Sequence, residues 1–313
     1  MRWLALFLYC GLAFAQGYPS KPLKLVTPFP PGGSADVIAR LTAQKLSENM
    51  RQPVVIDNRA GAGGLVGTEY AAKQPPDGYT LVLITGAYPV QAAMLKSMPF
   101  DPLTDVAMVS LLTSYPFVIS VRADSPFRSL GDLIAAAKAH PGKLNYPSSG
   151  IGTVHHLSGE LLNAMAGIDM THVPFRGGAS PLTEVLGGRV DLLLEAMTLS
   201  IGQIQSGKLR ALAVTSRERW KALPNVPTVA ETVPGYEVNS FIGLGASGGT
   251  PRELIERLNT EVRKALASAD TRQRFLELGG EPGATSPEEM KSFIEREIAK
   301  WREVIALRKI ERQ

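Results

Sequence analysis

The sequence predicts an α/β fold in which strands alternate with helices, and three observations support this prediction. Short apolar strands recur between segments of helical periodicity along most of the chain. Glycine-rich turns join several of these strands to the helices that follow them. The 313 residues, of which 44% are hydrophobic and 20% are charged, suffice for about two globular domains and exclude a disordered or collagen-like chain.

The expected elements follow one another in strand–helix order, which favours a parallel sheet. Strands are predicted near residues 23–27, 54–56, 80–85, 117–121, 143–146, 170–173, 190–194 and 209–215, and helices over 34–49 and 130–139. Further helices are expected to end at Ala72 and Ala166. Two helices close the chain, because Thr250–Glu253 and Ser286–Glu289 both have the capping-box spacing with proline at the first helical position.

The first residues predict export. Arg2 is followed by an apolar run of 13 residues, Trp3–Ala15, which is shorter than the roughly 20 residues that span a bilayer. The run ends in an A-x-A pattern, so we expect a signal peptide over residues 1–15 that is cleaved after Ala15, which places the mature protein in the periplasm. The alternatives are a membrane anchor, a buried strand, or a lipoprotein through Cys10, but the bulky Tyr9 precedes this cysteine.

Charge and cysteine content exclude several classes of protein. The formal net charge is only +4, and the basic residues are scattered, so no nucleic-acid partner is expected. The single cysteine excludes a disulfide framework and a thiolate metal site.

Residues for a metal, a cofactor or catalysis are also scarce. The histidines are His140, His155, His156 and His172. His155 and His156 are adjacent, so on a helix their side chains point about 100° apart, which does not suit joint metal ligation. Gly61, Gly63 and Gly67 are spaced one residue too long for the dinucleotide fingerprint, and no G-x-S-x-G motif occurs. We therefore expect no metal, no cofactor and no catalytic residue.

Glycine-rich turns are the candidate binding elements. In an open α/β sheet ligands bind beyond the carboxyl ends of the strands, where helix N-termini offer unpaired N–H groups and partial positive charge to an anion. Three turns have this form, namely 31–34, 61–64 and 150–153. The alternative is that each glycine serves only a tight turn or close helix packing.

Eight motifs cover nearly the whole chain after the apolar start. They are residues 18–36 (YPSKPLKLVTPFPPGGSAD), 55–64 (VIDNRAGAGG), 76–81 (PDGYTL), 146–156 (YPSSGIGTVHH), 173–179 (VPFRGGA), 187–191 (GGRVD), 207–216 (GKLRALAVTS) and 223–231 (LPNVPTVAE). This ordered series closely resembles the Bug-type receptors, which are the extracytoplasmic solute-binding proteins of tripartite tricarboxylate transporters.

The resemblance implies a two-lobed periplasmic-binding-protein fold of type II, in which each lobe is a central sheet flanked by helices. Lobe 1 is expected to comprise residues 18–120 and 242–313, and lobe 2 residues 121–241. The lobes would close on a small carboxylate about crossing strands near Val118–Arg122 and Val238–Gly243. The partners implied are this solute and the transporter's membrane subunits, and the receptor is expected to be a monomer.

The resemblance also implies the residues that bind the solute. They are Pro31, Gly32, Gly33, Ser34, Asp36, Ala62, Gly63, Gly64, Ser148, Gly150, Gly152, Thr153 and Arg176. Asp36 could instead cap its helix, and Arg176 could instead be a solvated surface charge.

One candidate departs from the family pattern. Leu194-Glu195-Ala196 replaces the usual Phe-Asp-Asn, so we expect Glu195 just beyond a strand, facing either the cleft or the lobe packing. In the cleft, Glu195 would receive an amino or hydroxyl group or repel a second carboxylate.

Two other functions stay open at this point. One is an exported α/β hydrolase that uses Ser148 or Ser149 with His156. The other is a sensor subunit that binds the same solute and signals to a membrane histidine kinase.

Overall fold

A computed structural model describes residues 17–307 and 310–312 of the chain. The expected signal peptide and its cleavage after Ala15 lie outside the described residues. Among the helices that are described, none combines the length and the apolar character needed to cross a bilayer.

The larger sheet belongs to lobe 1 and is mixed. Its strand order is β2 (Val54–Asn58), β1 (Leu23–Thr27), β3 (Thr80–Thr85), β9 (Asn239–Ser247), β4 (Val106–Arg122) and β10 (Glu281–Pro282). β1 runs parallel to β2 and β3, whereas β9 is antiparallel to both β3 and β4. The expectation of a parallel sheet is therefore right for the first three strands and wrong where the chain returns from lobe 2.

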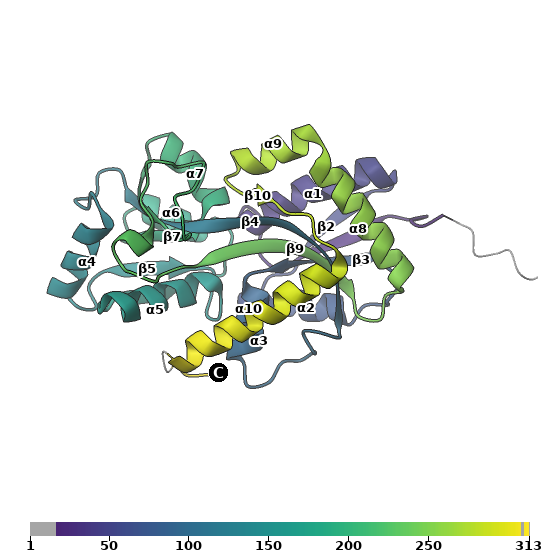
Figure 1. Cartoon of the computed structure of the whole chain (residues 1–313), viewed down its shortest axis with the longest axis horizontal. Helices are drawn as coiled ribbons and strands as arrows, with labels where there is room; N and C mark the ends of the chain where they lie inside the picture. Colours follow the sequence, from purple (N-terminus) through teal and green to yellow (C-terminus); the bar gives the residue numbers. More distant parts are fainter. Residues whose placement is uncertain (1–16, 308–309, 313) are drawn as a thin grey trace, which may run out of the picture.

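Helices cover both faces of this sheet. They are α1 (Ser34–Met50), α2 (Leu65–Ala72), α3 (Ala87–Met94), α8 (Arg252–Ala267), α9 (Ala269–Glu277) and α10 (Pro287–Leu307). In Figure 1, α1, α8 and α9 lie on one side of the strands, and α10, α3 and α2 lie on the other. Alternating strand residues supply both cores: Leu25 and Leu83 pack on the α1–α8 side, and Val26 and Ile84 pack on the α10 side.

Lobe 2 is built around the second part of β4. Its elements are α4 (Leu130–Ala139), β5 (Asn145–Ser148), α5 (Val154–Ala166), β6 (Thr171–Pro174), α6 (Ser180–Leu186), β7 (Leu193–Ala196), α7 (Met197–Gln205) and β8 (Leu209–Val214). β7 and β8 each pair with β4 in antiparallel fashion, and β5 pairs with β6 in parallel fashion.

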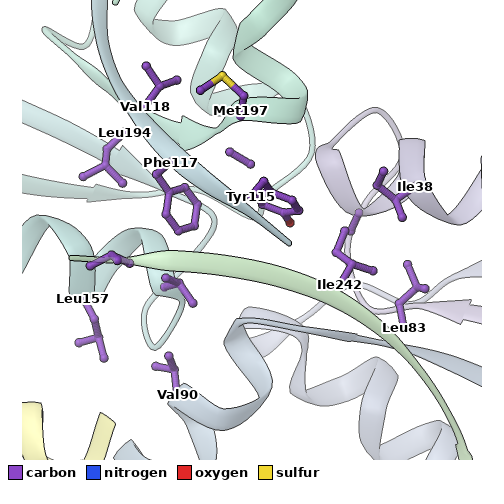
Figure 2. Packing of buried hydrophobic residues seen from close by; sticks show 14 of the residues in the cluster. Ile38, Leu83, Val90, Tyr115, Phe117, Val118, Leu157, Leu194, Met197 and Ile242 are labelled. Carbon is purple, nitrogen blue, oxygen red and sulfur yellow. The ribbon is translucent and has the colours of Figure 1, made fainter. Parts of the chain in front are cut away.

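The two lobes share strands and core. β4 pairs with β9 from Val106 to Pro116 and with β7 and β8 from Phe117 onward. Figure 2 shows Phe117 and Leu194 in the same packed cluster as Ile242 and Leu83. The connecting strands thus lie where crossing strands are expected, whereas the lobe boundaries and the hinge motion stay predictions.

The structure corrects three expectations about local elements. The helices α3, α6, α7 and α9 were not expected, so three helices rather than two close the chain, and β4 begins at Val106 rather than near residue 117. Thr250 does not cap α8, because its hydroxyl donates to the Ser247 carbonyl at 2.7 Å and the helix begins after Pro251. Ser286 does form the expected capping box, in which its hydroxyl and the Glu289 carboxylate each accept a backbone N–H.

Candidate functional site

Two neighbouring cavities lie between the loops of the two lobes. The larger, about 750 Å³, is lined by Phe29, Pro30, Ala60–Leu65, Gln91, Met94, Leu95, Ser149–Gly152 and Pro174–Arg176. The smaller, about 60 Å³, is lined by Phe29, Gly33–Ala35, Thr85–Ala87, Tyr115, Ser149, Thr153–His155, Gly178, Glu195, Ala196 and Ser240. Phe29 and Ser149 border both cavities, so the two cavities adjoin at these residues.

The loops that form these cavities approach each other as backbones. A β-carbon on Gly33 would lie 3.1 Å from the Cα of Gly178, and one on Gly63 would lie 3.0 Å from the Ile151 carbonyl oxygen. Gly178 also has a φ of +70°, which disfavours residues with a side chain. The glycines therefore permit the contact between the lobes, in addition to shaping turns.

The larger cavity is mainly apolar. Six of the expected site residues line it: Ala62, Gly63, Gly64, Gly150, Gly152 and Arg176. The turn before α2 is held in place by the amide of Gln91, which donates to the Ala62 carbonyl at 2.8 Å. Arg176 is the only charged lining residue that the described chain contributes here, and its side chain is exposed. A negatively charged part of a solute would meet its cation at this position.

The smaller cavity receives the N-termini of several helices. Residues at the starts of α1, α3, α5 and α7 all line it, and the expected site residues among its lining are Gly33, Ser34, Thr153 and Glu195. Unpaired N–H groups and partial positive charge at these ends favour an anion. The Ser34 hydroxyl is buried and makes no hydrogen bond. The cavity thus offers unused hydrogen-bonding capacity around a positive field.

A buried carboxylate forms one wall of the smaller cavity. Glu195 is only 3% exposed, and its Oε1 accepts from the Ala196 N–H and pairs with His155 Nε2, both at 2.8 Å. His155 Nδ1 in turn lies 3.3 Å from the Ser149 hydroxyl, and the Phe117 ring packs against the imidazole in a T-shaped arrangement with 4.7 Å between centroids. Glu195 lies within β7, opposite Val118, rather than beyond the end of a strand as expected.

Tyr115 lies close to this carboxylate. Burial raises the pKa of Tyr115 above its ordinary value; a hydrogen bond with Ser240 opposes the rise, and the charge of Glu195 adds to it. The phenol therefore stays protonated at neutral pH.

Serine–histidine pairs do occur, but not the pair expected for a hydrolase. Ser149 bonds to His155, and Ser148 bonds to His172 at 2.6 Å, so neither serine bonds to His156. Ser148 is buried and lines neither cavity. Its hydroxyl accepts the Gly150 N–H at 3.0 Å and so holds the turn before α5.

The rings of His156 and His172 stack, with their centroids 4.2 Å apart. Burial, and then the neighbouring His156, lower the pKa of His172 to about 4, and burial lowers the pKa of His156. Both histidines are therefore neutral at pH 7.

Asp36, Pro31 and Gly32 also line neither cavity. The Asp36 carboxylate accepts from the Gly32 N–H, from Asn58 and, through both oxygens, from Arg40. Burial opposes ionisation of Asp36, but these hydrogen bonds outweigh it and hold its pKa below the ordinary value. Asp36 therefore orders the turn that leads into α1.

Several lining residues were not singled out from the sequence as binding the solute. They are Phe29, Thr85, Gln91, Tyr115, Ser149, His155 and Ser240. Phe29 stands in the first family-like motif, and Ser149 and His155 stand in the fourth, so the motifs carried a signal for these three. In the part of the chain that the structure describes, no group of three or more His, Cys, Asp or Glu could hold a metal ion.

A two-lobed α/β fold with a glycine-lined cleft between the lobes defines a ligand-binding protein of the periplasmic type. Residues 38–310 match the model of the tripartite tricarboxylate transporter family receptors, and the chain belongs to that family.

Three solved structures are similar over nearly the whole chain. The first is the periplasmic binding protein BugD, with a TM-score of 0.90 and 31% identity over 95% of this chain and 100% of that one. The second is Rpa4515 of R. palustris with adipate, with a TM-score of 0.91 and 39% identity over 94% and 99%. The third is MatC of Rhodopseudomonas palustris with bound malate, with a TM-score of 0.87 and 30% identity over 92% and 100%.

Proposed function

We propose that this protein is a periplasmic receptor that captures a small carboxylate between its lobes and delivers it to the membrane subunits of a tripartite tricarboxylate transporter. The observation that carries this proposal is the convergence of the α1, α3, α5 and α7 N-termini on one small cavity. An anion there meets several partial positive charges where little water competes. The carboxylates named for Rpa4515 and MatC support the same class of solute.

Capture would proceed by closure about β4 and β9. The solute would bind the turns of lobe 1, and lobe 2 would then bring the Ser149–Thr153 loop and Arg176 against it. In this proposal lobe 1 comprises residues 18–120 and 242–313, lobe 2 comprises residues 121–241, and the receptor works as a monomer. It is exported, with the signal peptide removed after Ala15, and it leaves the solute chemically unchanged.

A thermal-shift screen of the exported protein tests the proposal. The panel holds amino diacids, tricarboxylates, aromatic acids and nicotinate-like rings, each beside its uncharged amide as a control. A solute at 100 times its Kd stabilises the folded state by about 2.7 kcal/mol, which corresponds to a rise in Tm of roughly 3–6 °C. X-ray scattering should then record a smaller radius of gyration. If no carboxylate shifts Tm or the radius, the proposal fails.

A further inference from the structure

The smaller cavity contains a protein carboxylate beside the helix N-termini that would hold the anion. Within the described chain, the charged or titratable side chains that line this cavity are Glu195, His155 and Tyr115, without any lysine or arginine. Glu195 Oε1 is engaged by His155 and the Ala196 N–H, and among residues 17–307 and 310–312 no hydrogen bond reaches the second oxygen of this carboxylate. A solute group that lies against Glu195 therefore meets a hydrogen-bond acceptor with negative charge.

The direction of the neighbouring hydrogen bonds extends this acceptor surface. In the tautomer that carries its proton on Nε2, His155 donates to Glu195 Oε1 at 2.8 Å, and its Nδ1 accepts the hydroxyl proton of Ser149 at 3.3 Å. Ser149 Oγ is then left with lone pairs toward the cavities. Beside the starts of α5 and α7, lobe 2 thus also presents acceptors at Glu195 and Ser149, whereas the lobe 1 wall holds the helix starts at Gly33–Ala35 and Gly86–Ala87 with their backbone donors.

We propose that the solute is a 2-hydroxy or 2-amino carboxylate, and that Glu195 is the residue that selects the hydroxyl or ammonium group. This inference rests on the proposed function and names the solute class within it. The carboxylate would bind the helix N-termini of lobe 1, and the donor on the adjacent carbon would bind Glu195 and Ser149. A cavity of about 60 Å³ holds only one end of a solute. The carboxylate and the hydroxyl or ammonium group must therefore lie on neighbouring carbons to reach this cavity together. The remainder would extend past Phe29 into the larger, mainly apolar cavity.

A plain dicarboxylate fits this arrangement poorly. With no donor at C2 it leaves the acceptors of Glu195 and Ser149 unpaired in a closed site, and an unpaired buried polar group is costly. A second carboxylate in the smaller cavity would meet the like charge of Glu195 with no cation beside it.

Calorimetry with matched solutes tests the inference. Each set holds one carbon skeleton with hydrogen, hydroxyl or ammonium at C2: propionate, lactate and alanine; succinate, malate and aspartate; glutarate, 2-hydroxyglutarate and glutamate; and 3-phenylpropionate, 3-phenyllactate and phenylalanine. In any set that binds, the hydroxy or amino member should bind at least tenfold more tightly than the plain acid. The tighter of these two identifies the donor as hydroxyl or ammonium.

Glu195→Gln measures the role of the carboxylate, because it keeps the shape and removes the charge. The preference for the substituted acid should fall at least tenfold, while the plain acid binds as well as before or better. Glu184→Gln is the matched control, because it removes a lobe 2 carboxylate that pairs with Arg189 and lies outside both cavities. It should change neither the preference for the substituted acid nor the affinity for the plain acid. If Glu195→Gln does not fold, Ser149→Ala replaces it and should lower the same preference at least threefold.

The outcomes separate the inference from the proposed function. A plain acid that binds as tightly as its substituted partners overturns the inference and leaves the receptor function intact. A preference that survives both Glu195→Gln and Ser149→Ala also overturns it. If no acid in any set or in the carboxylate panel binds, the proposed function fails and the inference fails with it.

Discussion

Gly33 at the start of α1 and Gly178 in the loop after β6 touch across the cleft, so closely that a β-carbon on Gly33 would lie 3.1 Å from the Cα of Gly178. Gly33 itself has an ordinary extended conformation, with φ −90° and ψ 174°, which any residue can adopt. A side chain there would strain the closed arrangement and leave lobe 1 undisturbed. Gly33→Val should therefore weaken solute binding at least tenfold, since overpacking costs about 1–3 kcal/mol.

The free protein should melt within about 3 °C of the wild type, because the strain falls on the contact between the lobes. Gly202→Val is the matched control, since a β-carbon at Gly202 meets nothing within 4 Å. Calorimetry that gives equal affinities for the wild type and Gly33→Val would refute this placement of the site.

Asp36 should matter for stability more than its distance from the cavities suggests. Asp36→Ala removes the acceptor for Gly32, Asn58 and Arg40, so we expect urea denaturation to record a loss of about 2–4 kcal/mol. Asp124→Ala breaks an exposed pair with Arg122 and should leave the free energy of unfolding nearly unchanged. Equal losses in the two variants would contradict the structural role of Asp36.

The stacked histidines should make stability depend on pH. The pKa of His172 falls to about 4 on folding, from about 6.5 in the unfolded chain. Between these values the unfolded state binds the extra proton, so stability is full above pH 6.5 and falls as the pH drops toward 4. The change in the pKa of His172 corresponds to about 3 kcal/mol of stability. Because the ring is partly in contact with solvent, the expected loss of stability is smaller, roughly 1–2 kcal/mol.

The measurement is the free energy of unfolding at pH 7 and at pH 4.5. Because carboxylates titrate in the same range, the contribution of His172 is obtained by comparing the wild type with variants. His172→Gln should reduce the pH dependence, whereas His140→Gln, at an exposed position, should leave it unchanged. If the His172 variant keeps the wild-type slope, the ring is not held neutral by its surroundings.

Hydrogen bonds link Ser149 to His155 and His155 to Glu195, as serine, histidine and a carboxylate are linked in a hydrolytic triad. We nevertheless expect no turnover. The Ser149–His155 distance of 3.3 Å exceeds the usual reach between a nucleophile and its base. Ser149 begins the loop 149–153 that joins β5 to α5, and this connection is longer than the sharp strand-to-helix turn that carries a nucleophilic serine. Incubation of the pure protein with p-nitrophenyl esters should release acid no faster than Ser149→Ala does. Steady hydrolysis that disappears in this variant would make the protein an enzyme.

The sequence was a good guide to local order and a poor one to long-range contacts. The bounds of β1, β3 and α4 agree with the expected ranges because each has a clear periodicity and turn signals at its ends. Helix α3 was missed because all its residues are buried and Pro89 lies inside it, so no amphipathic pattern marks it.

The same distinction applies to the site. The glycine turns could be located from their motifs, and ten of the fourteen expected residues line a cavity. The pairing of His155 with Glu195 joins residues 40 positions apart and depends on how α5 packs beside β7, which no local pattern reports.

β4 is a single strand that contributes to the hydrogen-bond ladders of both lobes. A slip of one residue along it would turn inward-facing side chains outward in both lobes at once. The strand register of one lobe therefore depends on that of the other, and the two lobes should fold and unfold as one cooperative unit.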